Sequence, residues 1–168
     1  MHGTATDPLV YPHPVTPKPG ELTEVAPGIL WLRLTLPFQV NHVNVYLIAH
    51  EGGWAVVDTG IGTDQTKATW DDLFAGPLKG QKITRLIITH SHPDHIGLTG
   101  WLAERFKCPL TITQTEYFHG LFHQTRRTET QVAPKAEFYR VHGIGEEGTN
   151  ALLGRGSNYL TRTTALPP

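Results

Sequence analysis

The stretch His-Ser-His-Pro-Asp-His, which begins at His90, places three imidazoles and one carboxylate within six positions. It ends an apolar run of strand length, "ITRLIITH". Because an extended backbone turns residues i and i+2 to the same side, His90 and His92 can converge on one point. Pro93 suits a sharp exit from the strand, Asp94 is then predicted to be the N-cap of the next helix, and His95 falls in its first turn. Imidazoles and a carboxylate at one strand end predict a site for Zn²⁺ or another borderline divalent ion.

Two plainer explanations fit these residues less well. Polar residues scattered around a strand–helix turn do not account for four ligand-type residues at H-x-H-x-D-H spacing. The tripeptide His92-Pro93-Asp94 also marks J-domain co-chaperones, but there it joins two basic helices, whereas an apolar strand precedes it here. A metal site is therefore the prediction for this stretch.

The composition limits the class of protein. A chain of 168 residues suits one domain with its own core, and a net charge of −1 gives no attraction to nucleic acid or to an anionic membrane. Cys108 is the single cysteine, which excludes a disulfide within the chain and fits a reducing compartment. The N-terminal sequence lacks the pattern of a signal peptide, and no apolar run approaches the roughly 18 residues of a membrane-spanning helix. We therefore expect a cytoplasmic protein with neither nucleic acid nor a membrane as partner.

The elements that must position the motif follow from apolar patterns and turn residues. Residues 1–20 contain five prolines and are expected to be a flexible arm, while residues 21–168 belong to one domain. From about Val132 the pattern weakens, and the sequence becomes rich in glycine and polar residues. Strands followed by strands that alternate with helices predict an α/β, or layered α+β, fold with a mixed sheet and helices on its outer face. The expected strands are 29–36, 43–50, 53–60, 83–90 and 109–115, and the expected helices are 65–76, 96–107 and 115–127.

Three features together resemble the metallo-β-lactamase superfamily. They are "THSHPDHIG" around His90, Asp58 in "VVDTG", and Asn44 in "NVYLI", with one amphipathic helix between Gly60 and the metal strand. The resemblance covers roughly residues 22–115. It implies the N-terminal half of an αβ/βα sandwich with a one- or two-metal site at the edge of its sheets.

The resemblance also implies roles for the motif residues. His90 and His92 would bind a first metal ion, and Asp94 and His95 a second, with zinc expected and iron or manganese also suited to these ligands. A metal-bound hydroxide would attack an ester, thioester, lactone, amide or phosphoester bond, and Asp94 would orient that hydroxide and accept its proton. Asp58 would hold the motif loop in place by hydrogen bonds.

The same resemblance implies three further metal ligands from a second half of the fold: a histidine, a bridging aspartate and a final histidine. The last aspartate of the chain is Asp94, so we expect an incomplete site and an absent second half. His119 and His123 have the i, i+4 spacing that can chelate a metal on a helix. Without the glutamate of H-E-x-x-H, they are expected to be solvated or to line the substrate entrance. His142 follows a strand-like run at 138–141, where it could act as the third histidine.

Two functions of different classes remain open. The first is a zinc-dependent hydrolase of a small-molecule ester, thioester or lactone. A thioesterase or glyoxalase II-like enzyme is the most specific expectation, with phosphodiesterase or ribonuclease activity as an alternative within the class. The second is a truncated, non-catalytic fragment that binds metal weakly and acts through association. A half sandwich would expose an apolar sheet face, so we expect self-association or complementation by the missing half.

Overall fold

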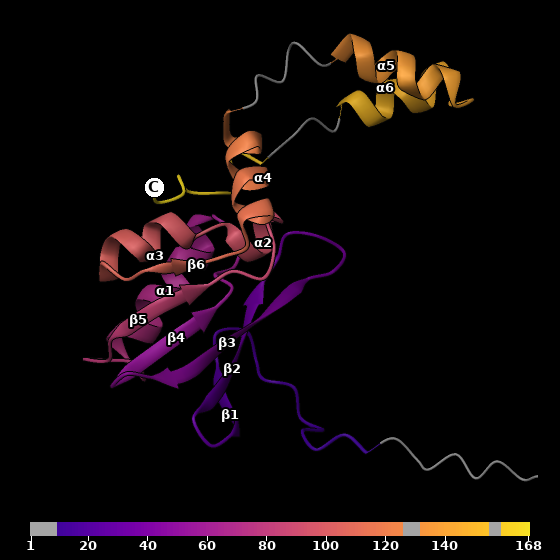
Figure 1. Cartoon of the computed structure of the whole chain (residues 1–168). Coiled ribbons are helices and arrows are strands. Elements are labelled where there is room, and N and C mark those ends of the chain that lie inside the picture. Colours follow the sequence, from indigo (N-terminus) through magenta and orange to yellow (C-terminus); the bar gives the residue numbers. More distant parts are fainter. Residues whose placement is uncertain (1–9, 126–131, 155–158) are drawn as a thin grey trace, which may run out of the picture.

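The computed structural model describes residues 10–125, 132–154 and 159–168. Its centre is a six-stranded sheet in the order β1-β2-β3-β4-β5-β6, with helices packed against it (Figure 1). The strands are β1 (Leu22–Ala26), β2 (Ile29–Thr35), β3 (His42–His50), β4 (Gly53–Val57), β5 (Ile83–Ile87) and β6 (Leu110–Thr111). The helices are α1 (Asp64–Ala75), α2 (Pro93–Ile96), α3 (Thr99–Phe106), α4 (Gln114–Thr125), α5 (Val132–Val141) and α6 (Glu146–Gly154). The expected layered fold with a mixed sheet is confirmed.

The direction of strand pairing changes at β4. Strands β1 to β4 pair antiparallel, and the turn Glu51-Gly52 takes positive φ angles of 48° and 74°, as a tight hairpin between β3 and β4 requires. Strands β4, β5 and β6 pair parallel, so the chain crosses over between them, first through α1 and then through α2 and α3. Because the carboxyl ends of parallel neighbours share one edge of a sheet, the residues that follow β4 and β5 meet there.

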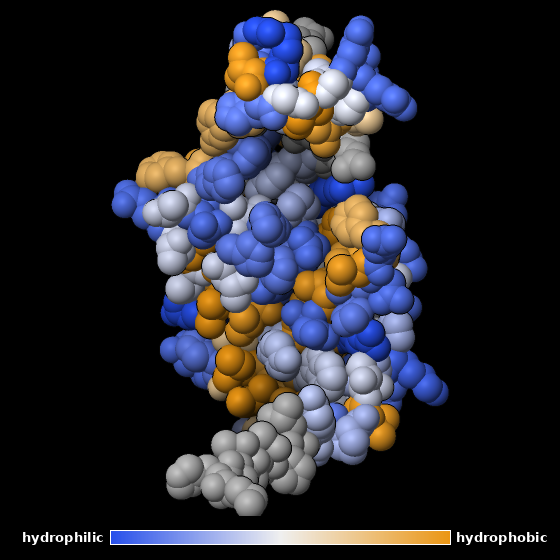
Figure 2. Space-filling model, turned by 90° about the vertical axis from the view of Figure 1, so that its right-hand side faces the viewer, coloured by the Kyte–Doolittle hydropathy of each residue, from blue (hydrophilic) through white to orange (hydrophobic). Residues whose placement is uncertain are grey.

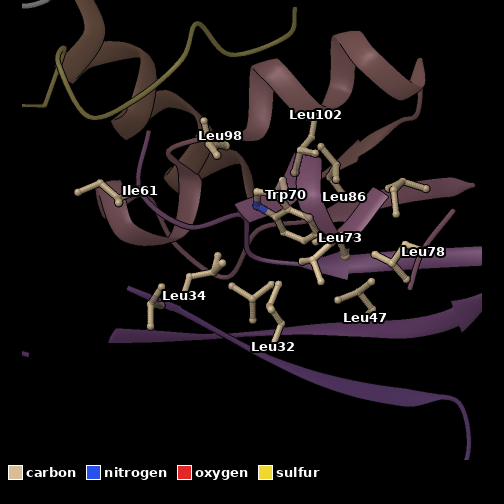
Figure 3. Packing of buried hydrophobic residues seen from close by; sticks show 14 of the residues in the cluster. Leu32, Leu34, Leu47, Ile61, Trp70, Leu73, Leu78, Leu86, Leu98 and Leu102 are labelled. Carbon is tan, nitrogen blue, oxygen red and sulfur yellow. The ribbon is translucent and has the colours of Figure 1, made fainter. Parts of the chain in front are cut away.

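The helices cover one face of the sheet and bury its apolar side chains. Alternate residues of β2 and β3, such as Leu32 and Leu47, point into this core, as the two-residue period of a strand predicts. Trp70 of α1 is fully buried among them (Figure 3), and its Nε1–H donates to the Thr59 carbonyl oxygen at 3.0 Å. This bond ties α1 to the turn that follows β4, next to Asp58.

Helix α1 begins and ends one residue earlier than the sequence predicts. Thr63 is its N-cap, and the Thr63 hydroxyl accepts a hydrogen bond from the Thr66 amide. At the other end the Gly76 amide donates to the Asp72 carbonyl oxygen at 2.9 Å, and Pro77 follows. Local capping chemistry therefore fixes the length of this crossover helix.

The opposite face of the sheet carries apolar side chains that remain partly exposed. Trp31, Tyr46, Val57 and Ile87 are direct cross-strand partners on β2 to β5, so they form one continuous row. Ile48, on the same face, is 37% exposed. Figure 2 shows apolar side chains gathered along the lower left of the molecule, between patches of polar ones. The sheet thus has one face covered by helices and a second face with accessible apolar area.

Several element boundaries differ from the sequence predictions. β1 is an additional strand, and the strands expected at 53–60 and 83–90 end earlier, at Val57 and Ile87, because the following residues curl into the edge of the sheet. The strand expected at 109–115 is reduced to β6, the helix expected at 96–107 is shortened to α3, and the short helix α2 precedes it. Residues 10–19 form no helix or strand, while residues 1–9 of the expected arm lie outside the described residues.

The largest difference concerns residues 132–154, for which the sequence predicts no clear element. They form α5 and α6, which pack against each other away from the sheet (Figure 1). The strand-like run at 138–141 lies within α5, so that prediction is wrong. Each of these helices contacts mainly the other, so neither needs the broad apolar stripe of a core helix that sequence patterns detect. No helix among the described residues is both long and apolar enough to cross a membrane.

Candidate functional site

Asp58 is the first residue after β4 and begins the candidate site. Its backbone is left-handed, with φ of 63°, a region that aspartate tolerates better than most residues. The Asp58 amide donates to the Ile87 carbonyl oxygen at 2.8 Å, which joins the ends of β4 and β5. This turn directs the Asp58 carboxylate across the edge of the sheet toward the motif that follows β5.

The Asp58 carboxylate is buried and fully engaged by the motif. Oδ1 accepts the Thr89 amide at 2.9 Å, and Oδ2 accepts the Thr89 hydroxyl at 2.8 Å and His95 Nδ1 at 2.8 Å. Burial raises the pKa of Asp58, but the hydrogen bonds from His95 and Thr89 outweigh burial and hold this pKa below its ordinary value. Asp58 is therefore an ionised acceptor that binds residues at both the entry and the exit of the motif.

His95 is the partner whose charge responds most directly to Asp58. Burial lowers the pKa of His95, but the hydrogen bond to Asp58 and the charges of Asp58 and Asp94 raise it above its ordinary value. With Nδ1 directed at Asp58, the remaining ring nitrogen, Nε2, lies 3.4 Å from Asp94 Oδ2. The imidazole and the carboxylate thus approach each other on the side away from Asp58.

Asp94 is not the N-cap of the helix after β5, contrary to the sequence prediction. The helix α2 begins at Pro93, and His92 is its N-cap, in an extended conformation with φ of −64° and ψ of 142°. Proline is favoured at the first helical position because its ring fixes φ and its missing N–H has no partner there. Asp94 therefore lies inside the first turn of α2, where its side chain can face His95.

The imidazoles of the motif gather at the end of β5. The ring centroid of His90 lies 4.6 Å from that of His92 and 4.0 Å from that of His95. Burial, and next the positive charges of His95 and His92, lower the pKa of His90. The His90 ring is therefore neutral at neutral pH, as a metal ligand must be. Within the described ranges, however, no three side chains of His, Cys, Asp or Glu are arranged to hold a metal ion.

The donor set suits a divalent cation in one specific respect. Histidines that bind metals usually donate their other ring N–H to a carboxylate or carbonyl, which fixes the tautomer and the direction of the ring. The pair His95–Asp58 has this arrangement, and it leaves Nε2 of His95 on the side of Asp94. The chemistry of the motif therefore fits a metal ion, with His95 already oriented by a buried carboxylate.

The helices after the motif are held close to the turn that follows β4. The Thr59 amide and hydroxyl both donate to the His95 carbonyl oxygen at 2.8 Å, and the Leu98 amide donates to the Thr59 hydroxyl at 3.1 Å. A Cβ at Gly97 would collide with the backbone of Gly62 and Gly60. Glycine at 97 is therefore needed for this close approach of the two backbone segments.

Of the two histidines on α4, His119 contacts the motif directly and His123 contacts His119. His119 Nδ1 is 2.8 Å from the Ser91 hydroxyl, between the first two motif histidines, and His119 Nε2 is 2.9 Å from His123 Nε2. Their role at a substrate entrance stays a prediction. His142 follows α5, and its Nδ1 binds the Phe138 carbonyl oxygen at 2.8 Å. A helix end, and not the expected strand end, positions His142.

Three residues of the site were not identified from the sequence. Glu116 accepts the Ser91 amide at 2.7 Å, and the Tyr159 hydroxyl donates to the Ser91 carbonyl oxygen at 2.9 Å. Burial, and next the charge of Glu116, raises the pKa of Tyr159 to about 12, so its hydroxyl stays protonated as a donor. Thr89 supplies two of the donors to Asp58. Only the fold brings the first two to the motif, although Thr89 is adjacent to it.

Comparison with solved structures places this geometry among known folds. A beta-lactamase domain protein from Burkholderia ambifaria is 30% identical, with a TM-score of 0.70, and the match covers 92% of this chain and 43% of that one. A metallo-beta-lactamase family protein from Thermus thermophilus is 24% identical, with a TM-score of 0.65, and the match covers 86% of this chain and 46% of the other. A metallo-beta-lactamase from Pseudomonas aeruginosa, solved in a mono-zinc form, is 18% identical, with a TM-score of 0.51. That match covers 62% of this chain and 46% of the other. The chain spans less than half the length of these structures.

The sequence itself gives a family match. A search among curated proteins found no significant match. A model of the metallo-beta-lactamase superfamily, in contrast, matches residues 39–165, which include Asp58 and the whole motif. On this match, together with the fold and the structural neighbours, the chain belongs to the metallo-beta-lactamase superfamily.

Proposed function

We propose that this chain supplies the first half of the metal centre of a metal-dependent hydrolase. Its ligands are His90 and His92 for one ion and Asp94 and His95 for a second, with zinc as the metal and iron or manganese as substitutes. The observation that carries the proposal is the pair His95–Asp58, in which a buried carboxylate orients a motif imidazole at 2.8 Å while two further imidazoles lie beside it.

The roles of the protein groups follow from their surroundings. Asp58 is buried and saturated with hydrogen bonds, so it orients His95 and Thr89 and takes no part in proton transfer. Asp94 is partly exposed and lies beside His95, so it is the carboxylate that can orient a water molecule and accept its proton. A bound zinc ion would supply a Lewis acid and lower the pKa of water toward neutrality.

The substrate class is a small-molecule ester or thioester. Residues 115–168 hold six Arg and Lys against five Glu, which offers no basic stripe for a nucleic acid backbone. A phosphodiesterase or ribonuclease would need such a stripe from elsewhere. A thioesterase or glyoxalase II-like activity is therefore the more specific form of the proposal.

Hydrolysis of an aryl ester, an acyl thioester and a phosphodiester by the zinc-loaded chain tests this function. We expect slow, zinc-dependent turnover of the ester or thioester, because the resemblance implies three ligands in addition to those of the motif. Asp94→Ala should abolish turnover, while Thr115→Ala, an exposed change on α4, should leave it unchanged. A rate that is equal with EDTA, or equal in Asp94→Ala, contradicts the proposal.

A second candidate is a non-catalytic chain that binds metal weakly and acts through association. The absence, among the described residues, of three side chains already arranged around one point favours it. The accessible apolar row on the sheet favours association, either with a second half of the sandwich or with another copy of the chain. Zinc binding without any turnover would support this candidate over the hydrolase.

A further inference from the structure

Ser91 lies between His90 and His92 and is almost completely buried, with 3% of its surface exposed. The segment from Ile88 to His92 is neither strand nor helix. The Ile88 amide is held by Thr111 and the His92 carbonyl oxygen by α2, but no backbone–backbone hydrogen bond among the described residues fixes the two peptide groups on either side of Ser91. Whatever holds Ser91 therefore also decides where the two neighbouring imidazoles point.

All three polar groups of Ser91 are bound by residues from outside the motif. Its amide donates to Glu116 Oε2 at 2.7 Å, its hydroxyl is 2.8 Å from His119 Nδ1, and its carbonyl oxygen accepts the Tyr159 hydroxyl at 2.9 Å. Glu116 and His119 come from the first turns of α4. Tyr159 comes from the segment that follows α6 and is itself 8% exposed.

These bonds act on the two peptide groups that connect Ser91 to the motif histidines. The Ser91 amide belongs to the peptide group shared with His90, and the Ser91 carbonyl belongs to the peptide group shared with His92. Fixing both peptide planes limits the backbone angles of Ser91 and of its neighbours, and thereby the directions of both Cα–Cβ bonds. The third bond, from the side chain, holds Ser91 against α4.

Asp58 performs the corresponding task on the other side of the motif. It binds Thr89 before His90 and the ring of His95 after Asp94, but no bond from Asp58 reaches His92. The Ser91 contacts therefore fall on the part of the loop that Asp58 leaves unsupported.

We propose that Glu116, His119 and Tyr159 are positioning residues that hold His90 and His92 in the direction needed to share one metal ion. The proposal rests on the metal-ligand roles given above under the proposed function. It assigns α4 and the segment after α6 a part in metal binding, although neither provides a ligand.

Zinc affinity of the folded chain, measured by competition with a chromophoric chelator, tests this assignment. Glu116→Ala, His119→Ala and Tyr159→Phe should each weaken zinc binding roughly 10-fold, the scale on which supporting residues of metal sites act. Two conservative changes separate positioning from other effects. Glu116→Gln keeps an acceptor for the Ser91 amide without the charge, and His119→Asn keeps a polar group near the position of Nδ1, so both should retain most of the affinity.

The outcomes separate this inference from the function on which it rests. If the wild-type chain binds no zinc, the proposed function and the positioning roles both fail. If wild type binds zinc and the three disruptive variants bind it equally well, only the positioning roles fail. A lower Tm of the metal-free variants with unchanged zinc affinity would indicate a purely structural role and overturn the inference. Equal weakening by Glu116→Gln and Glu116→Ala would assign the effect to charge and overturn the role of Glu116, with Thr115→Ala as the unaffected control.

Discussion

The Asp58 carboxylate binds residues on both sides of the motif histidines. Burial alone disfavours its charged form, yet three donors from Thr89 and His95 keep it ionised. The carboxylate in turn stabilises the charged form of His95, whose pKa is raised. In the metal-free protein each of the two residues thus favours the charged form of the other, at the point where two strand ends meet.

The first prediction concerns this pair and pH. Since the folded pKa of Asp58 lies below its ordinary value of about 3.9, its stabilisation is full above that pH and is lost as pH falls through the folded pKa. Since the folded pKa of His95 lies above its ordinary value of about 6.5, its stabilisation is full below that pH and is lost as pH rises through the folded pKa. The pair therefore stabilises the metal-free chain most between about pH 4 and 6.5.

Asp58→Asn should remove most of this pH-dependent term and lower the free energy of unfolding by about 2 kcal/mol, as expected for hydrogen bonds to a charged group. Urea denaturation of the EDTA-treated wild type and variant, at a series of pH values, measures both effects. A stability difference that stays constant from acid to neutral pH would show that the charged pair contributes nothing.

At the scale of single residues, the motif was predictable because its histidines and aspartate are close in the sequence. Their short spacing at a strand-to-helix exit predicts that His90, His92 and His95 lie close together, and their rings do so, although β5 ends at Ile87 before them. The N-cap assignment of Asp94 was wrong because Pro93 at the first helical position moves the cap back to His92. The partners of Ser91 could not be predicted, since Tyr159 is 68 residues away from it and no local pattern links them.

At the scale of elements, the junction of α2 and α3 depends on how closely it approaches the turn after β4. Gly97 allows this approach, since a side chain there would meet backbone atoms that cannot move independently. The junction carries His95 on one side and starts α3 on the other. Its position therefore couples the packing of the helices to the geometry of the site.

Gly97→Ala should lower the free energy of unfolding by about 1–3 kcal/mol, the usual cost of forcing atoms into a packed region. It should also weaken zinc binding, because His95 would move with the displaced backbone. Gly145→Ala is a suitable control, since nothing lies within 4 Å of the added Cβ. Equal stability of the two variants in chemical denaturation would contradict the requirement for close approach.

Elements were predictable where a strong local pattern meets a clear stop signal. The hairpin at Glu51-Gly52 and the capped helix α1 are of this kind, and the structure has both. Helix α6 lies in a segment rich in glycine and polar residues, and α5 and α6 pack mainly against each other. Sequence patterns report packing against a large core more clearly than packing between two small helices.

At the scale of the whole molecule, the two faces of the sheet are unequal. One face is covered by α1 and α3, while the row Trp31–Tyr46–Val57–Ile87 on the other remains partly exposed. Exposed apolar rows of this kind favour association. The matches cover 43% and 46% of two relatives of known structure, so more than half of each relative lies outside the part that this chain resembles.

The chain on its own should therefore associate in a concentration-dependent manner. Tyr46→Lys, in the middle of the row, should shift the equilibrium toward the monomer, because a buried lysine in the interface has no partner. Gln65→Lys, an exposed change of equal charge on α1, should have no effect. Sedimentation velocity over a range of concentrations measures this, and a monomer at every concentration in all three proteins would contradict the expected role of this face.

The zinc content of the purified 168-residue chain, after loading and dialysis, tests most directly whether the motif is a metal centre. Elemental analysis of wild type, His92→Ala and His142→Ala compares a motif histidine with one that the structure places at the end of α5. We predict that wild type and His142→Ala retain the same amount of zinc and that His92→Ala loses most of it. No zinc in the wild type, or equal zinc in all three proteins, would contradict the assignment of the motif as a metal site.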